Sequence, residues 1–433
     1  MWIARTTRLV RIPAYQAACT VWCCWLAATP AGAGDWPGFR GPRHDGTASD
    51  SHAPVHWSAT ENVRWKAPLP RPANGSPVVA AGRVWVTSAE DPRGMRRSLY
   101  CLDRETGATR WVATVDFGRE MPTHKTNPYC GTTPVVSDGR VVVWHGSAGL
   151  YCYDLDGNEL WHRDLGEFRH IWGYGSSPIV HDGVVLLNSG PGLRVFAIAL
   201  RLEDGQTVWQ RDEPVTGDGS RNAAGAYTGS WSTPIVARVG GRDIAIFAMP
   251  TRLVAYAVDS GDEVWSCGGV NHPKGDLAYA SPTLVDGICF YTGGFGGPML
   301  SVLVDGRGDV TETKRLFRIE KQPQAIGSPV AVEGAIYRPN AGPGTIECID
   351  PKTGRVRWVS RGAGGNMWAS LVRAGDLLYA TNQQGTTVVF RANPEKYEEV
   401  ARNQLEDGCN ATPAISDGNV FVRTDRFVWC IGE

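Results

Sequence analysis

The amino-acid sequence predicts an all-β protein, an eight-bladed β-propeller with four antiparallel strands in each blade. The first observation is a repeated phrase, in which two short apolar strands flank a turn ending in glycine and a tryptophan follows four residues later. This phrase occurs five times, with its tryptophan at Trp111, Trp161, Trp209, Trp265 and Trp358. The turn glycine supplies the positive φ that such a hairpin needs. A fixed spacing reused along the chain indicates a repeat architecture.

The second observation is the period at which strands open. A small hydroxyl residue, usually followed by proline, begins each of eight units that are 42 to 57 residues apart. These openings are Ser76-Pro77, Thr133-Pro134, Ser177-Pro178, Thr233-Pro234, Ser281-Pro282, Ser328-Pro329, Ser370-Leu371 and Thr412-Pro413. Four short strands at this period are typical of propeller blades. Alternation of apolar and polar residues with period two excludes a helical solenoid.

The third observation is that the two ends of the chain complement each other. The eighth unit stops at Gly432 after its third strand and has no tryptophan strand of its own. The stretch around Trp65 is such a strand with no unit before it. We therefore expect the N-terminal strand to pair with the last blade and close the ring, which leaves no unpaired edge. Two units depart from the pattern: Phe317 replaces tryptophan in the fifth, and the seventh has neither the glycine nor the tryptophan over residues 393–400.

Residues 1–33 have the features of a secretory signal peptide. The basic start contains Arg5, Arg8 and Arg11. An apolar stretch follows over Ala17–Ala28, and a small-residue cleavage site lies at Ala31–Ala33. The apolar stretch is shorter than the ~20 residues that span a bilayer. We expect an exported chain, periplasmic or extracellular, that begins near Gly34 and has no membrane span; a retained anchor is the alternative. Cys19 lacks the usual sequence context for lipid attachment.

Residues 34–60 form an extended N-terminal lead, and residues 61–433 a single propeller domain. The lead is rich in glycine and proline, and we expect Trp36 and Phe39 to pin it to the body, since exposed aromatic surface is costly. The net charge of −1 argues against a nucleic-acid partner or an anionic membrane surface. We expect a monomer.

The segments 101–111 and 350–358 resemble the tryptophan repeat of the pyrroloquinoline-quinone-type propellers, a resemblance that extends over residues 61–432. Residues 36–42 also look like the start of exported bacterial members of that superfamily. One class that shares the repeat is the quinoprotein dehydrogenases. The resemblance to this class implies that pyrroloquinoline quinone and a calcium ion bind at the central axis, often with two adjacent cysteines beside the cofactor. After residue 33 the chain has no adjacent cysteine pair and no evident set of hard oxygen ligands for calcium.

The other class is non-catalytic and is typified by the BamB-type outer-membrane assembly lipoprotein. The resemblance to it implies a ring that serves as a docking surface for other envelope proteins. We expect an exported, non-catalytic binding or assembly scaffold of the cell envelope rather than an enzyme. The alternative is a quinone-dependent oxidoreductase, or a small-ligand sensor, that uses the central funnel. The expected partner is an envelope protein or a small molecule, and no cofactor is assigned.

The loops that lead into the first strand of each blade gather around one mouth of the central channel. They carry aromatic, histidine and amide side chains, which suit a small-molecule or peptide site. The candidate binding residues are His124, His170, Trp172, Tyr174, Trp231, Tyr279, Asn366 and Trp368. The alternative is that these aromatic side chains only fill and rigidify the funnel. No Ser/His/Asp order or paired-carboxylate spacing stands out, so we name no catalytic residue and no metal ligand.

Overall fold

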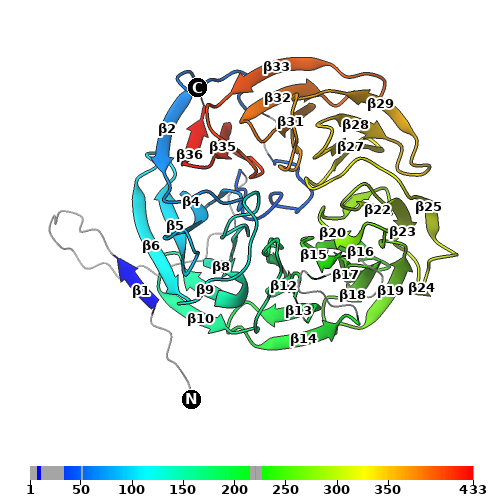
Figure 1. Cartoon of the computed structure of the whole chain (residues 1–433), viewed down its shortest axis with the longest axis horizontal. Coiled ribbons are helices and arrows are strands. Elements are labelled where there is room, and N and C mark those ends of the chain that lie inside the picture. Colours follow the sequence, from blue (N-terminus) through cyan, green and yellow to red (C-terminus); the bar gives the residue numbers. More distant parts are fainter. Residues whose placement is uncertain are drawn as a thin grey trace.

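The structure, a computed structural model, describes residues 7–10, 34–49, 52–192, 194–214, 220 and 227–432. Eight four-stranded antiparallel sheets stand around a central axis like the blades of a propeller (Figure 1). The predicted all-β, eight-bladed architecture is therefore confirmed.

Blades one to four follow one another along the chain, each running from the axis to the rim. They comprise β3 (Val78–Ala80), β4 (Arg83–Ala89), β5 (Arg96–Asp103) and β6 (Thr109–Asp116); β7 (Val135–Ser137), β8 (Arg140–Trp144), β9 (Leu150–Asp154) and β10 (Glu159–Arg163); β11 (Ile179–His181), β12 (Val184–Asn188), β13 (Phe196–Arg201) and β14 (Thr207–Asp212); and β16 (Ile235–Val239), β17 (Arg242–Ala248), β18 (Arg252–Ala257) and β19 (Glu263–Gly268).

Blades five to eight continue the ring, and the last of them takes its outer strand from the start of the chain. They comprise β21 (Thr283–Val285), β22 (Ile288–Thr292), β23 (Met299–Leu303) and β25 (Arg315–Ile319); β26 (Val330–Val332), β27 (Ala335–Pro339), β28 (Ile346–Ile349) and β29 (Val356–Ser360); β30 (Val372–Ala374), β31 (Leu377–Thr381), β32 (Thr386–Arg391) and β33 (Glu399–Gln404); and β34 (Ala414–Ser416), β35 (Asn419–Arg423), β36 (Phe427–Ile431) and β2 (Val63–Pro68).

Further short elements lie outside this repeat. β1 (Thr7–Val10) pairs antiparallel with β6, β24 (Gly308–Asp309) pairs parallel with β19, and η1 (Gly146–Ala148) is a 3-10 turn. β15 (Tyr227–Ser230) and β20 (Gly275–Ala278) form a parallel pair between neighbouring blades. Across the described part of the chain, no helix is long and apolar enough to cross a membrane.

Tight turns join the first two strands of each blade. In blades one and two these turns are Ala81-Gly82 and Asp138-Gly139, with φ of 52° and 67° and of 49° and 70°. Positive φ at both central residues is the conformation of the type I′ hairpin, whose twist matches that of the flanking strands. The dipeptides that mark these turns in the sequence are therefore set by backbone geometry.

The ring closes as the sequence predicts. β2 pairs antiparallel with β36, with Trp65 opposite Cys430, so that the N-terminal strand completes blade eight. In Figure 1 the C-terminus lies beside β2, next to the first blade. This pairing removes the unpaired edge that an open ring would have between its first and last blades.

The tryptophan of one blade crosses to the next blade at the rim. The Nε1 group of Trp111 donates to the Leu155 carbonyl at 3.0 Å, and its ring lies where a Cβ on Gly157 would stand, 2.8 Å away. Trp161 and Trp209 make the corresponding contacts with the following blade. Only a residue without a Cβ leaves room for the indole, which explains the turn glycines Gly157, Gly205 and Gly261.

The two departures from the repeat have structural replacements. In blade five, the ring of Phe317 lies on Gly354 of blade six, in the place of an indole. In blade seven, Trp57 of the N-terminal lead is buried and stacks on Tyr379 with ring centroids 6.4 Å apart. Its backbone N–H also donates to Asn403 of β33 at 2.8 Å. A segment distant in sequence thus fills the space that the missing tryptophan leaves.

Candidate functional site

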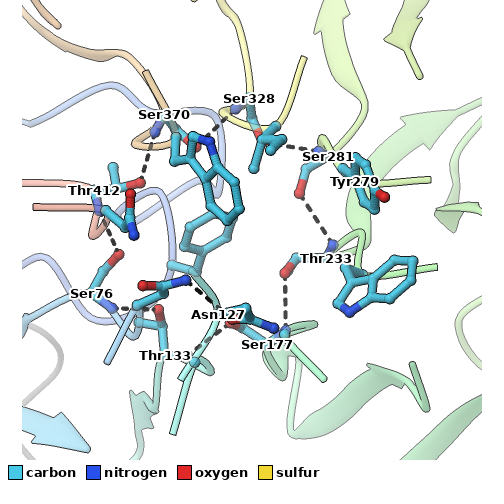
Figure 2. Close-up of a pocket in the computed structure, with 18 of the residues that line it drawn as sticks. Ser76, Asn127, Thr133, Ser177, Thr233, Tyr279, Ser281, Ser328, Ser370 and Thr412 are labelled. Atoms are coloured by element: carbon cyan, nitrogen blue, oxygen red, sulfur yellow. Dashed lines mark hydrogen bonds between the residues drawn. The ribbon is translucent and has the colours of Figure 1, made fainter. Parts of the chain in front are cut away.

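The hydroxyl residues that open the blades form a closed hydrogen-bonded ring around the axis. The backbone N–H of Ser76 donates to Thr133 Oγ1 at 3.0 Å, and the N–H of Thr133 donates to Ser177 Oγ at 3.0 Å. The same bond recurs at each blade until the N–H of Thr412 donates back to Ser76 Oγ at 3.0 Å (Figure 2). Because all eight side chains are buried, these bonds satisfy backbone donors that water does not reach.

The N-terminal lead crosses the axis on the far side of this ring from the mouth loops. Trp36 bridges to Val79 of blade one, and Ala48 donates to the Arg373 carbonyl of blade seven. Between them, Arg40 is buried and donates to the carbonyls of Pro282 and Pro329. The blue trace across the centre of Figure 1 shows this course. The lead thus forms the floor of the channel.

A pocket of about 380 Å³ occupies the channel between this floor and the mouth. The ring hydroxyls line it, and Phe39 of the lead reaches it from below. Each of the eight blade-to-blade connections adds a further side chain. In chain order these are Asn74, Asn127, Trp172, Trp231, Tyr279, Gln324, Trp368 and Asn410, four amides and four aromatic residues.

Strand-like alternation explains which positions face the pocket. The residue two places before each ring hydroxyl lines it in every blade, as expected for side chains that point the same way along an extended backbone. At two of these positions the residue is glycine, and a neighbouring side chain takes the space. A Cβ on Gly131 would lie 2.9 Å from Asn127 Oδ1, and one on Gly175 would lie 3.2 Å from Trp231 Cδ1.

One wall of the pocket is aromatic. Trp172 lies 5.3 Å from Phe295 between ring centroids, and Trp231 lies 5.1 Å from Tyr279. The buried ring of His170 packs beneath Trp172 and Trp231, at 5.1 and 4.9 Å. The indole of Trp231 is oriented further by a hydrogen bond from Nε1 to the Gly173 carbonyl, 2.9 Å long. These contacts fix the wall before any ligand arrives.

Amide side chains form the wall on the side of blades one, two and eight. Asn74 donates to Asn127 Oδ1 at 3.1 Å, and Asn127 donates to the Trp172 carbonyl at 2.7 Å. Asn410 donates to the Thr126 carbonyl and accepts from Gln383. The amide groups are thereby oriented by bonds that link several blades.

Solved structures with the same fold belong to both functional classes. The chain superposes on BamB from Moraxella catarrhalis with a TM-score of 0.57, 14% identity, and coverage of 85% of this chain and 99% of that one. For a quinohemoprotein alcohol dehydrogenase from Comamonas testosteroni the TM-score is 0.61, with 13% identity and coverage of 94% and 81%. For a europium-containing methanol dehydrogenase it is 0.67, with 12% identity and coverage of 92% and 91%. At these identities the likeness shows the fold alone.

The sequence decides the family. The family described as outer membrane protein assembly factor BamB matches residues 47–115, 95–360 and 326–432. The chain belongs to this family. No curated protein sequence matches it significantly. The predicted relationship to the BamB-type, pyrroloquinoline-quinone-like propellers is therefore confirmed.

Five of the eight candidate residues line the pocket of this BamB-family chain: His124, Trp172, Trp231, Tyr279 and Trp368. The structure places the other three elsewhere. His170 packs behind the aromatic wall, and Tyr174 is buried with its hydroxyl 3.4 Å from Arg97 Nη1. Asn366 is exposed and lies outside the pocket lining. Alternation alone would place Asn366 on the same side as Trp368, two residues later. Asn366 instead directly follows the bend at residues 362–365 and lies outside the lining.

Two aromatic residues of the pocket were not among the predicted site residues. Phe39 lies in the lead and reaches the axis only after the chain has folded across it. Phe295 lies in the loop between the second and third strands of blade five, a different set of loops from those that lead into blades. Its φ of 47° is rare for a bulky residue. The only sequence signal is a lone aromatic residue between two pairs of glycines, Gly293-Gly294 and Gly296-Gly297.

The lining does not fit pyrroloquinoline quinone with calcium. That cofactor carries three carboxylates, yet no Lys or Arg lines the described pocket, and no Asp or Glu lies there to bind calcium. Buried ionised groups without partners are strongly disfavoured. Outside the pocket lining, His181, Asp182 and Asp243 place ligand atoms within 4.8 Å of one another. Asp243 already accepts from Arg238 at 3.2 Å, and we assign no metal ion to this cluster.

Proposed function

We propose that this chain is an exported, non-catalytic binding protein of the cell envelope, and that the funnel mouth is its binding face. The observation that carries the proposal is the set of eight side chains, one from each blade-to-blade connection, that line the pocket above the hydrogen-bonded ring. It combines aromatic and amide side chains, and it offers no paired carboxylates for acid–base chemistry within the described pocket. Variable side chains on a rigid scaffold are the usual arrangement of a recognition site.

The family description and the predicted signal peptide support a place in the envelope. Cleavage after Ala33 would begin the chain at Gly34, which already contacts Asp417 of blade eight. N-terminal sequencing of protein recovered from cell fractions tests this. We expect a chain that begins near Gly34 in the periplasmic or secreted fraction; an intact N-terminus in the cytoplasmic fraction would contradict export.

A photo-crosslinking experiment in cells tests the binding face. A crosslinking amino acid replaces exposed His124 at the mouth, or exposed Thr353 in a turn on the opposite face as the matched control. We expect adducts from position 124 and not from position 353. The double variant Trp172→Ala, Trp368→Ala should lose them while its circular dichroism spectrum stays that of a folded protein. Adducts confined to position 353 would place the binding face on the opposite side of the propeller.

The alternative, a quinone-dependent oxidoreductase, has support only from the shared fold. Titration with pyrroloquinoline quinone and calcium, followed by absorbance and by dye-linked alcohol oxidation, separates the two functions. We expect no saturable spectral change and no turnover, because the pocket lacks charged partners for the quinone. Turnover that is lost in Trp172→Ala would establish the oxidoreductase instead.

A further inference from the structure

The two walls of the pocket indicate what kind of ligand it takes. We propose that the funnel binds a neutral saccharide, with a sugar ring against the aromatic wall and its hydroxyl groups toward the amide and hydroxyl groups. This inference rests on the proposed function, because it assumes that the funnel mouth is the binding face.

The first argument is charge. The described residues that line the pocket include His124 at the rim and no Lys, Arg, Asp or Glu. A phosphate, a carboxylate or an ammonium group would enter without an ion-pair partner, at a large desolvation cost. The lining therefore favours an uncharged ligand.

The second argument is the shape of the aromatic wall. The rings of Trp172 and Trp231 are inclined by 45°, those of Trp231 and Tyr279 by 60°, and those of Trp172 and Phe295 by 79°. None of these pairs forms the parallel slot that would hold a flat heterocycle. A curved wall suits a puckered ring, whose C–H groups can each meet the electron-rich face of a different aromatic side chain.

The third argument is hydrogen-bonding capacity. Among the described residues, neither the Tyr279 hydroxyl nor the Gln324 side-chain amide makes a hydrogen bond, and both residues line the pocket. A purely apolar ligand, or a quaternary ammonium, would bury these groups unpaired, which is unfavourable. A ligand with several hydroxyl groups satisfies them. Burial also raises the pKa of Tyr279, so that its phenol remains a neutral donor.

Size and access agree with this assignment. A pocket of about 380 Å³ lies at the small end of the range of ligand sites, roughly 300–1,000 Å³. Phe39 closes it below and the mouth loops leave it open above. The space therefore suits one or two sugar units, and a longer glycan would extend outward through the mouth.

Isothermal titration of the full mature chain with defined sugars tests the proposal. The probes are cellobiose, maltose and N,N′-diacetylchitobiose, each neutral, with chitobiose and glucuronate as charged counterparts. We expect saturable binding of at least one neutral disaccharide and binding at least ~10-fold weaker for the charged counterparts.

Pocket variants show whether that binding occurs in the funnel. Tyr279→Phe keeps the ring and removes one hydroxyl, so the Kd should rise about 3- to 10-fold, as for one lost hydrogen bond. Trp368→Ala should raise the Kd more than ~10-fold. The control Tyr100→Phe removes a hydroxyl that bonds Glu90 outside the pocket, and the Kd should not change. The melting temperature of each variant establishes that it is folded.

Four outcomes would overturn the inference. The first is that no neutral disaccharide binds at millimolar concentration. The second is that a disaccharide binds but its Kd is the same for Tyr279→Phe and Trp368→Ala as for the unsubstituted chain. A neutral flavin that binds in the funnel while sugars do not would refute the saccharide and leave the funnel as the binding face. Quinone-dependent turnover would refute both the saccharide and the proposed function.

Discussion

The indole of Trp65 lies on Gly107, and this contact joins the two ends of the chain. Trp65 stands in β2, the outer strand of blade eight, and its Nε1 group donates to the Arg104 carbonyl of blade one at 2.7 Å. A Cβ on Gly107 would come within 2.6 Å of the ring. The interface that closes the propeller therefore uses the same contact that Trp111, Trp161 and Trp209 make between consecutive blades.

Removing this indole should destabilise the whole ring. We expect Trp65→Ala to lower the free energy of unfolding by about 3–5 kcal/mol, because a buried aromatic ring is replaced by a cavity. Urea denaturation followed by circular dichroism measures the change. Val359→Ala, which removes an exposed side chain from β29, should change it by less than about 0.5 kcal/mol. Equal effects of the two substitutions would contradict the role of Trp65 in closure.

The buried guanidinium of Arg40 should hold the N-terminal lead, which forms the floor of the funnel, against the blades. Arg40→Met removes the bonds to the Pro282, Pro329 and Asp45 carbonyls, of which the Pro329 carbonyl still accepts from Thr283 Oγ1 at 3.1 Å. We expect a loss of about 2–4 kcal/mol in unfolding free energy. The control is Arg43→Met, three residues away, whose exposed side chain pairs with Asp45 at 3.1 Å and should contribute under 1 kcal/mol. Similar melting temperatures for both variants would show that the lead is held by other contacts.

The hydroxyl ring should respond to a substitution that preserves shape. Thr133→Val removes the Oγ1 acceptor of the Ser76 N–H and leaves that buried donor unpaired. We expect a loss of about 1–3 kcal/mol in unfolding free energy. Thr313→Val, at an exposed position, is the matched control. Native-state hydrogen exchange provides a second measurement, since the Ser76 amide should exchange faster in Thr133→Val and not in the control.

One buried histidine should make the protein sensitive to acid. Burial, and more weakly the charge of Arg97, lower the pKa of His145 to about 3 from its usual 6.5. Below pH 6.5 the unfolded chain binds a proton that the folded one does not, so stability falls as pH falls from 6.5 toward 3, by up to about 1.4 kcal/mol per pH unit. His145→Phe should therefore lose less unfolding free energy between pH 7 and pH 4 than the unsubstituted chain. Replacing exposed His56 by Gln should leave the pH dependence as it was.

The fold was predictable because its signals are local and repeated. Glycine and tryptophan recur because the indole of one blade can need a turn without a Cβ in the next, as Gly157 provides for Trp111. Hydroxyl residues recur at blade openings because each, like Thr133, accepts a backbone hydrogen bond from the preceding blade. The closing strand around Trp65 was recognisable because the last unit lacks the same element.

The candidate site was predictable only in part. The number of blades, their closure and the loops that reach the mouth could be predicted, since backbone geometry and burial impose these on every repeat. Which side chains meet at the axis could not. Trp368 lines the pocket, whereas Asn366, two residues earlier and just after a bend, does not. Phe39 and Phe295 come from segments outside the loops that lead into the blades. Such contacts depend on where the whole chain brings distant residues together, and no local spacing encodes that.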